Sequence, residues 1–482
     1  MTRAVVLGGG MAGMLSAAVL ARHVDEVVVL ESDAYPAAPG PRKGLPQAYQ
    51  NHMLMGGGAQ AVDRLLPGTT DALIAAGAQR RSIGNQFLIL TAEGWSGRFA
   101  TDAFVINSSR HLVDFVVRQQ VLRDPKITVA EATTATGLRG DRDTITGVYA
   151  DGGKRTFDAD FVVDATGARS KAPQWLTELG LPMVEEQFLD AGLAYAGRWY
   201  ELPDGAGADF PGVLIQAEPA TGRPGRGAAL MPNEDGRWIV ALMGTRGAHP
   251  PHDEEGFLNY ALALRHPIIG NILSAARPLG TIRSSRATAN RRRFFEQMRM
   301  PGNFVAIGDA VTVVSPNYAT GMSVAALGAL ALSERLDRTG LGRESVVKAQ
   351  AAIAKAGNWP WQMALGNDRW FPGVETNVRM EQLFGMDLSG VLGPFQQRMT
   401  ARWQRTAAAN FAMSRVTHDM TALTGSPAAM MSPRLMWSLI RGPQRPPLTA
   451  PAAIAQFPEF GELPYPAAVV EDLPLPQVEG AR

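Results

Sequence analysis

The residues that decide the fold stand at the start of the chain: Ala4-Val5-Val6-Leu7-Gly8-Gly9-Gly10-Met11-Ala12-Gly13. Four apolar residues open this stretch and suit a central parallel strand that is buried on both faces. The glycines have the spacing GxGxxG, and the Ala- and Leu-rich residues 14–22 predict a helix directly after them. A second apolar run, residues 27–30, ends at Glu31. Strand, glycine turn, helix, strand and acid, in that order, predict an α/β unit that binds a dinucleotide.

Each of these positions has a physical task in such a unit. Gly8 makes the tight turn, Gly10 lets a pyrophosphate approach the backbone, and Gly13 lets the helix pack on the strand. The start of the helix offers free N–H groups and the positive end of its dipole to the phosphates. Glu31 accepts hydrogen bonds from a ribose diol. The spacing alone does not choose FAD over NAD.

Composition excludes several classes of protein. Across 482 residues, 46 Lys and Arg against 45 Asp and Glu leave a net charge of +1, which disfavours a nucleic-acid partner. The chain has no cysteine, which excludes disulfide scaffolds, thiolate metal sites and cysteine nucleophiles. Residues 4–21 are uncharged, but four glycines favour strand, turn and helix over a membrane helix or signal peptide. We therefore expect a soluble, cytoplasmic protein of two or three packed units, without a membrane partner.

Two later segments have the same pattern of a strand that delivers an acid to a turn of small residues. Residues 161–167 read Phe-Val-Val-Asp-Ala-Thr-Gly, and residues 304–310 read Phe-Val-Ala-Ile-Gly-Asp-Ala. Residues 315–323 then lead into a predicted helix at 324–335. The second aspartate can accept hydrogen bonds from a sugar-alcohol chain, and the N–H groups of the helix start can face a carbonyl that gains negative charge.

Together these motifs resemble the FAD-dependent group A (aromatic-hydroxylase-type) flavoprotein monooxygenases. Residues 41–48, 66–71 and 290–293 narrow the resemblance to the polyketide epoxidases of polyether antibiotic biosynthesis, the lasalocid and monensin type, over most of residues 3–335. The resemblance implies an α/β fold: an FAD-binding Rossmann-like (GR2-type) domain with an inserted mixed β-sheet for substrate and a helical C-terminal region. It also implies bound FAD, NADPH as reductant, and epoxidation of a polyketide alkene through a flavin C4a-hydroperoxide.

The resemblance further implies which residues contact the cofactor, although it names no catalytic residue and no metal ligand. Candidates that face the flavin or the substrate are His52, Tyr318 and Thr320. The implied FAD-binding residues are Gly8, Gly10, Met11, Ala12, Gly13, Glu31, Ser32, Arg42, Lys43, Arg110, Asp164, Thr166, Gly167, Gly308, Asp309, Pro316, Gly321, Met322 and Ser323.

Two departures from the family pattern keep a second function open. Residues 49–51 read Tyr-Gln-Asn where the epoxidases have Arg-His-Ala, and Ala319-Thr320 replaces Gly-His. Both changes fall where the flavin ring is expected. The alternative is an FAD-containing non-redox cyclase of the [4+2] cycloaddition type in polyketide antibiotic biosynthesis, with FAD as a structural group and a shaped pocket as catalyst. For the monooxygenase, a separate flavin reductase is an alternative source of electrons.

Chain order predicts five segments. The FAD-binding domain comprises residues 1–184 and 281–340, and the substrate sheet lies between them at 185–280. A hairpin in that sheet pairs 228–231 with 237–242 around Asn233-Glu234-Asp235-Gly236. Residues 341–442 lack strand patterns and predict a helical unit. The last 40 residues, 443–482, contain nine prolines and predict an extended or partly mobile surface tail.

Three groups outside these motifs have competing interpretations. For Arg291, Arg292 and Arg293, a solvated face is favoured over contact with phosphate or NADPH. His249, His252 and Asp253 suggest a metal site only weakly, because they lie in a Pro-rich loop. Methionines of the C-terminal helices are interpreted as core residues, with a pocket for a long polyketide as the alternative: Met413, Met420, Met430, Met431 and Met436.

Overall fold

The N-terminal stretch forms strand β1 (Arg3–Leu7) and helix α1 (Met11–Leu20), with the glycine turn between them. In the computed structural model, which describes residues 1–207, 209–286, 289–378, 382–383, 386–387 and 389–462, β1 lies at the centre of a parallel sheet. The order of that sheet is β20 (Phe304–Ala306), β12 (Phe161–Asp164), β1, β2 (Glu26–Leu30) and β8 (Ile127–Ala130). The expected α/β class is confirmed.

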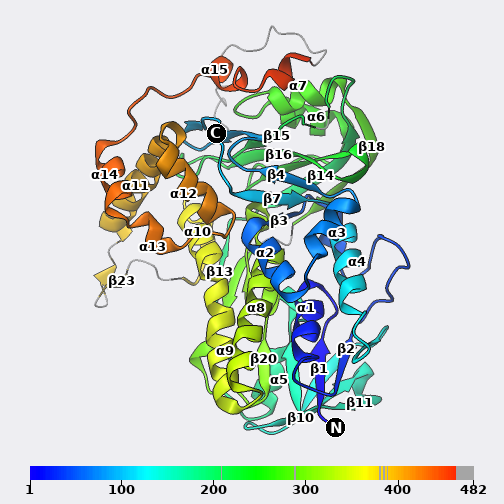
Figure 1. Cartoon of the computed structure of the whole chain (residues 1–482). Coiled ribbons are helices and arrows are strands. Elements are labelled where there is room, and N and C mark those ends of the chain that lie inside the picture. The colour runs from blue at the N-terminus through cyan, green and yellow to red at the C-terminus, as the bar shows by residue number, and fades with distance from the viewer. Residues whose placement is uncertain (208, 287–288, 379–381, 384–385, 388, 463–482) are drawn as a thin grey trace.

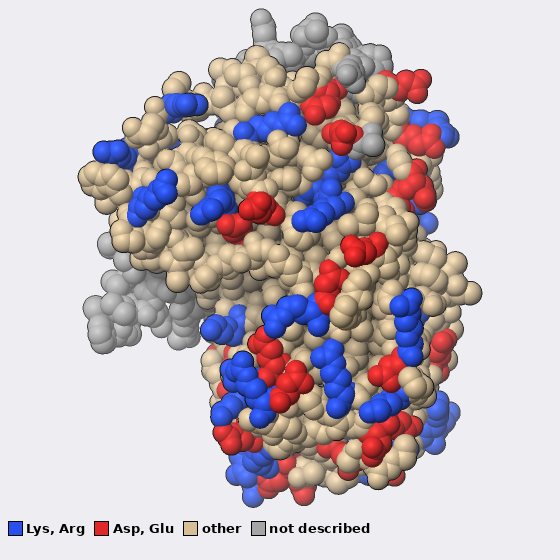
Figure 2. Space-filling model, viewed as in Figure 1, with Lys and Arg blue, Asp and Glu red and all other residues tan. Residues whose placement is uncertain are grey.

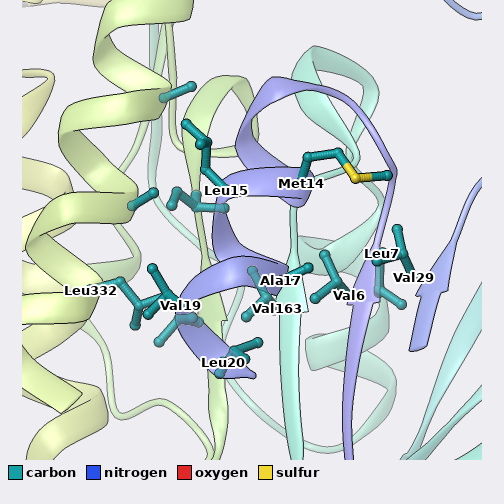
Figure 3. Packing of buried hydrophobic residues seen from close by; sticks show 14 of the residues in the cluster. Val6, Leu7, Met14, Leu15, Ala17, Val19, Leu20, Val29, Val163 and Leu332 are labelled. Carbon is teal, nitrogen blue, oxygen red and sulfur yellow. The ribbon is translucent and has the colours of Figure 1, made fainter. Parts of the chain in front are cut away.

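Helices cover this sheet and bury its apolar strands. Leu15 and Val19 of α1 point toward α8 (Gly321–Thr339) and its Leu332, while Met14 and Val6 belong to the same cluster on the strand side (Figure 3). Helix α9 (Arg343–Ala356) packs on α8, and α4 (Arg110–Val121) packs on α1. Strands β9 (Ala135–Gly140) and β10 (Ile145–Ala150) add Leu138 and Val148 to the same cluster, so the partners of the parallel sheet are not helices alone.

A second, seven-stranded mixed sheet corresponds to the expected substrate sheet. Its order is β18 (Arg277–Ser285), β14 (Ala194–Glu201), β17 (Trp238–Gly244), β16 (Arg226–Pro232), β15 (Gly212–Ile215), β5 (Phe87–Thr91) and β6 (Gly94–Trp95). The antiparallel β16–β17 hairpin confirms the predicted pairing. Strands β5 and β6 lie outside the range 185–280, because β15 pairs in parallel with β5 from a distant part of the chain. Chain order alone does not indicate such a pairing.

Smaller sheets and further helices complete the described chain. The additional strands are β3 (Met53–Met55), β4 (Gln79–Ser82), β7 (Phe104–Asn107), β9 (Ala135–Gly140), β10 (Ile145–Ala150), β11 (Arg155–Asp158), β13 (Glu186–Asp190), β19 (Asn290–Arg293), β21 (Thr312–Val313), β22 (Glu375–Thr376), β23 (Gln382–Leu383) and β24 (Met386–Asp387). The additional helices are α2 (Gly56–Leu65), α3 (Thr69–Ala75), α5 (Ala172–Glu178), α6 (Glu254–Leu262), α7 (Ile268–Ala275), α10 (Asn358–Asp368), α11 (Ser389–Ala409), α12 (Phe411–Thr421), α13 (Pro427–Met430), α14 (Pro433–Arg441) and α15 (Ala450–Ile454).

The C-terminal region is helical as predicted, with two differences. Strand β22 adds an edge to β13, and β23 pairs with β24; strands of two residues are too short to leave an alternating pattern in the sequence. The tail is not simply an extended surface segment: α15 lies over the substrate sheet (Figure 1), and Phe457 and Phe460 are buried in that sheet's core. Residues 463–482 of the predicted tail lie outside the described residues.

Two observations concern the membrane and nucleic-acid partners that the composition disfavours. Within the described residues, no helix has the length and apolar character needed to cross a bilayer. On the face shown in Figure 2, basic and acidic side chains are interspersed rather than gathered in one basic field. A nucleic-acid footprint would require clustered Lys and Arg.

Candidate active site

The glycine turn at the start of α1 has the geometry that its sequence predicts. Gly8 has φ +92°, and a Cβ there would lie 2.7 Å from the Ala165 carbonyl oxygen. A Cβ on Gly13 would lie 1.8 Å from the carbonyl oxygen of Gly8, so the helix approaches the strand as closely as glycine permits. A Cβ on Gly10 would meet nothing within 4 Å. The backbone at Gly10 is therefore open on the side where a pyrophosphate would approach.

Ion pairs beside this turn bring together three predicted residues from distant segments. Glu31 is buried; its Oε2 accepts a hydrogen bond from Gly9 N at 2.8 Å and pairs with Arg42 Nη2 at 2.6 Å. Arg42 also lies 3.1 Å from Asp114, and Arg110 Nε donates to that same carboxylate at 2.8 Å. Two guanidinium groups are thus fixed near the glycine turn. Of the neighbouring candidates, Ser32 Oγ donates to Glu31 at 3.2 Å, and Lys43 is exposed.

The turn after β12 is built around Asp164. Its carboxylate is fully buried and accepts hydrogen bonds from Thr166 N at 3.0 Å and from Ser170 Oγ. Burial raises the pKa of Asp164, and the hydrogen bonds from Ser170 and Thr166 oppose this shift. Asp164 therefore shapes the turn that presents Gly167, whose φ is +80°.

The turn after β20 contains Asp309, which differs from Asp164 in its hydrogen bonding. Burial raises the pKa of Asp309, and the positive charge of Arg110 opposes the shift. Gly308 makes this turn with φ +63°, and the Cβ position of Gly321, the first residue of α8, is 3.7 Å from Asp309 Oδ1. No hydrogen bond from the described residues reaches this carboxylate. Asp309 is thus available to accept hydrogen bonds from hydroxyl groups of a ligand at the start of α8.

The arginines of β19 connect these two turns, so the preferred interpretation as a solvated face is wrong for Arg292 and Arg293. Arg293 donates to Ala310 O at 3.0 Å and to Ala168 O at 3.1 Å, and it pairs with Glu186 at 2.9 Å. Arg292 is also buried and pairs with Glu296 at 2.7 Å. Strand β19 lies between β13 and β21, and its Arg292 and Arg293 are buried whereas Arg291 is 37% exposed, a difference that a run of three like charges does not indicate.

The start of α8 is fixed by a glycine-rich helix that sequence reasoning missed. Ser323 Oγ accepts a hydrogen bond from Met55 N at 2.9 Å, so this hydroxyl joins α8 to β3. At the start of α2, a Cβ on Gly58 would lie 2.5 Å from Ser323 Oγ, and one on Gly57 would lie 2.0 Å from Leu423 O. Gly57 N also donates to Ala422 O at 2.8 Å. The consecutive glycines 56–58 are the signal, because only glycine permits such close contacts.

An apolar cavity of about 140 Å³ lies between the substrate sheet and the C-terminal helices. Strands β3, β5, β7, β15 and β16 contribute residues such as Met55 and Leu214, and α11 and α12 contribute residues such as Gln404 and His418. Ala319, in the loop before α8, packs against the same hydrophobic cluster as Met55. This cavity is therefore adjacent to the start of α8. Of the methionines predicted for the C-terminal core, Met413, Met420, Met430 and Met436 pack in a separate cluster. The prediction is wrong for Met431, which directly follows the one-turn helix α13 and is 69% exposed.

The sequence profile described as "FAD binding domain" matches residues 1–343. The chain belongs to this FAD binding domain family. Protein Rv3254 of Mycobacterium tuberculosis (strain ATCC 25618 / H37Rv) is 29% identical over 382 residues, which cover 76% of this chain and 80% of that protein.

Solved structures of a flavin-dependent halogenase, a Diels-Alderase and a probable FAD-dependent monooxygenase share the fold of this FAD binding domain protein at low sequence identity. The halogenase CmlS has a TM-score of 0.59 at 18% identity, covering 88% of this chain and 76% of that chain. The Diels-Alderase PyrE3 of the pyrroindomycin pathway has a TM-score of 0.58 at 15% identity, covering 89% and 81%. PqsL, a probable FAD-dependent monooxygenase from Pseudomonas aeruginosa, has a TM-score of 0.54 at 16% identity, covering 76% and 94%.

The residues of this FAD binding domain protein fit FAD. The open backbone at Gly10 suits a pyrophosphate, and the free carboxylate of Asp309 suits the hydroxyls of the ribityl chain. The start of α8 has backbone N–H groups without intrahelical partners, which suit the carbonyl edge of a flavin ring. Thr320, which immediately precedes α8, has a buried Oγ1 without a partner among the described residues.

Substitutions in the glycine turn should separate cofactor binding from folding. We expect Gly10→Ala to leave the free energy of unfolding without FAD unchanged, because the Cβ meets open space, and to weaken FAD binding at least about tenfold, or about 1.4 kcal/mol. Gly13→Ala should lower the stability itself by about 1–3 kcal/mol through overpacking. Urea unfolding without FAD and titration of bound flavin measure the two effects. Equal stability losses in both variants would contradict the assigned roles.

Tyr318, a flavin-facing candidate, belongs to a buried network that sequence reasoning did not find. Tyr318 donates to Asp368 Oδ1 at 2.6 Å, and Asn290 Nδ2 donates to Asp368 Oδ2 at 2.7 Å. The Asn290 side-chain oxygen accepts a hydrogen bond from Ser315 N at 2.7 Å, and Ser315 Oγ lies 3.3 Å from the hydroxyl of Tyr195. The network therefore fixes the loop before α8 to α10, β19 and the substrate sheet.

Asp368 should make stability depend on pH. Burial raises the pKa of Asp368 to about 6, although hydrogen bonds from Tyr318 and Asn290 oppose the shift. The folded protein then holds a proton that the unfolded chain releases near pH 4, so stability falls as pH rises from about 4 to 6. Relative to Asp368→Asn, wild type should lose about 3 kcal/mol over this interval. Urea unfolding at pH 4, 5, 6 and 7 measures this difference, and parallel pH curves would contradict it.

The remaining histidine candidates take no part in the hydrogen-bond network of Tyr318 and Asp368. His52 Nδ1 lies 2.8 Å from Gln50 O, and burial, aided by Arg110, lowers the pKa of His52 to about 4. No hydrogen bond of the described residues joins His52 to Tyr318. In the loop considered for a metal, Asp253 caps α6 and His249 contacts Gly192 O at 2.8 Å. The described part of the chain contains no cluster of three metal-ligating side chains.

Proposed function

We propose that this protein is an FAD-dependent monooxygenase that converts a carbon–carbon double bond of a polyketide intermediate into an epoxide, with NADPH as reductant. One O₂, one NADPH and one proton are consumed for each epoxide, with release of NADP⁺ and water. Bound FAD supplies the redox chemistry, as flavin cofactors do generally. The observation that carries the proposal is the apolar cavity beside the start of α8, since oxygen transfer to an alkene requires a dry, uncharged site.

The protein's own residues supply binding and positioning in this proposal. Gly10, Glu31 and Asp309 hold the cofactor, and the Asp368–Tyr318 pair holds the loop that leads into α8. The cavity walls exclude water and orient the double bond. About 140 Å³ accommodates only a segment of a long polyketide, so the remainder of such a chain lies outside the cavity.

An anaerobic titration with NADPH tests the proposal. Purified yellow protein should lose its oxidised-flavin absorbance, and admission of air with geraniol, an unsaturated alcohol, should give a product with one added oxygen atom. A parallel sample with a flavin reductase tests whether a partner supplies the electrons. A flavin that both donors reduce, without any oxygenated product from a series of alkenes, would contradict epoxidation.

A non-redox cyclase of the [4+2] type is the second candidate. Two observations favour it: the fold similarity to the Diels-Alderase PyrE3, and cavity walls that lack Lys, Arg, Asp and Glu among the described residues. Such an enzyme needs a shaped pocket and no electron transfer. A flavin that stays oxidised with NADPH and with the reductase would support this candidate, and a requirement for reduced flavin would exclude it.

A further inference from the structure

One polar side chain of the apolar cavity has no partner for its oxygen. Gln404 lines the cavity from α11, and its Oε1 is buried without a hydrogen-bond partner among the described residues. Neighbouring polar groups are satisfied: Thr417 donates to Met413 O at 2.8 Å and accepts from Trp403 Nε1 at 2.9 Å, and Thr421 donates to Thr417 O at 2.9 Å. A buried amide oxygen without a partner is costly, which indicates a missing hydrogen-bond donor.

The charge of the cavity restricts what that group can be. Among the described residues that line it, His418 is the only one with a titratable side chain, and burial lowers its pKa to about 4. His418 is therefore neutral, with Thr101 Oγ1 at 3.3 Å and Ser414 Oγ at 3.4 Å from its ring nitrogens. A carboxylate or phosphate buried here would lose its hydration without gaining a cation, which is strongly unfavourable.

From this pattern we propose that the cavity binds an uncharged, hydroxyl-bearing segment of the substrate and that Gln404 is the anchor for the hydroxyl group. The proposal rests on the proposed function for the identity of the cavity as the substrate site. A hydroxyl can donate to the amide oxygen or accept from the amide N–H, so it suits either orientation of the Gln404 amide.

Size and position define the rest of the ligand. The remaining walls are apolar, and about 140 Å³ is close to a cavity of roughly 150 Å³ that holds benzene. The segment is therefore a six-membered ring or an equally short chain. Met55 lines the same cavity from β3, and its backbone N–H donates to Ser323 in the first turn of α8. A hydroxyl anchored at Gln404 thus holds the apolar segment next to the strand that α8 contacts.

Binding can be measured without turnover, because methionines line the cavity. We would label the holoenzyme with ¹³C-methyl methionine and follow Met53, Met55 and Met231 by NMR while adding benzyl alcohol, toluene or benzoate. Benzyl alcohol should shift these methyl signals with an affinity about three- to tenfold above that of toluene, since one hydrogen bond is added. Benzoate should not shift them. Absence of binding by benzyl alcohol, or binding of benzoate with equal affinity, would overturn the proposal.

A variant pair tests the assignment to Gln404. Gln404→Leu should bring the affinity for benzyl alcohol down to that for toluene and leave toluene binding in place. Gln396→Leu, an exposed glutamine in the same helix α11, is the matched control and should retain the preference. If Gln404→Leu retains the preference, the assignment is wrong. If it does not fold, the comparison of the three probes in wild type still tests whether the cavity binds an uncharged, hydroxyl-bearing ligand, and Gln404→Glu, which should abolish the preference by adding a charge, replaces it as the test of the anchor.

These measurements separate the inference from the proposed function. Probe binding is recorded with oxidised flavin and without NADPH. If the enzyme proves not to be an epoxidase, the measured affinities for the probes therefore still hold. An active epoxidase in which Gln404→Leu does not alter probe affinities would overturn only the anchor.

Discussion

Arg293→Met should lower the free energy of unfolding by about 3–5 kcal/mol and release FAD. The guanidinium donates to carbonyl oxygens of Ala168 and Ala310, which belong to the turns after β12 and β20. Methionine fills similar volume but has no donor, so two carbonyl groups lose a charged hydrogen-bond partner in a buried site. The ion pair with Glu186 adds little, since that carboxylate is 39% exposed. Urea unfolding and the flavin retained after gel filtration measure both effects.

Two companion variants make the result specific. Arg299→Met removes an arginine that is 69% exposed and pairs with Asp143, and it should cost less than about 1 kcal/mol. Arg293→Lys keeps the charge but not the planar fork that reaches both carbonyl groups, so it should restore only part of the stability. Equal stability of Arg293→Met and Arg299→Met would show that the connection between the two turns contributes nothing.

The arginine connection also shows where sequence reasoning ends. The glycine turn and its strand, helix and acid lie within 31 residues, so local spacing predicts their geometry. Arg293 acts across more than 100 residues, on Ala168, and the sequence near it shows only a run of like charges. Its burial is decided by β13 and β21, which pair with β19 from distant positions.

The same limit applies to groups outside the nucleotide-binding motifs. Asp368 and Tyr318 are 50 residues apart, and neither lies in a recognisable motif with the other. Phe457 and Phe460 stand in a Pro-rich segment whose composition predicts a surface tail, yet their aromatic side chains are buried in the core of the substrate sheet. Aromatic residues within the tail were the available signal, because burial of such rings is strongly favourable. Local pattern therefore predicts the nucleotide-binding half far better than the substrate half.

Gly57→Ala should destabilise the protein by at least about 2 kcal/mol and change the cavity more than the cofactor site. The new Cβ would stand 2.0 Å from Leu423 O, a backbone atom that moves only with the end of α12. Helix α12 carries Thr417 and His418 of the cavity wall. We therefore expect weaker binding of benzyl alcohol by methyl NMR, together with the loss of stability in urea.

Substitution of the neighbouring Gly58 should have a different effect from substitution of Gly57. Gly58→Ala places its Cβ 2.6 Å from Ser323 Cα in the first turn of α8, so it should weaken FAD binding more than probe binding. Gly366→Ala, at an exposed position in the last turn of α10 with open space around its Cβ, controls for the substitution and should raise stability by up to about 1 kcal/mol. If Gly57→Ala and Gly58→Ala weaken FAD binding and probe binding in the same proportion, then the two glycines do not affect the two sites separately. If instead the two effects separate, consecutive residues of one helix start place the cofactor helix and the cavity wall independently.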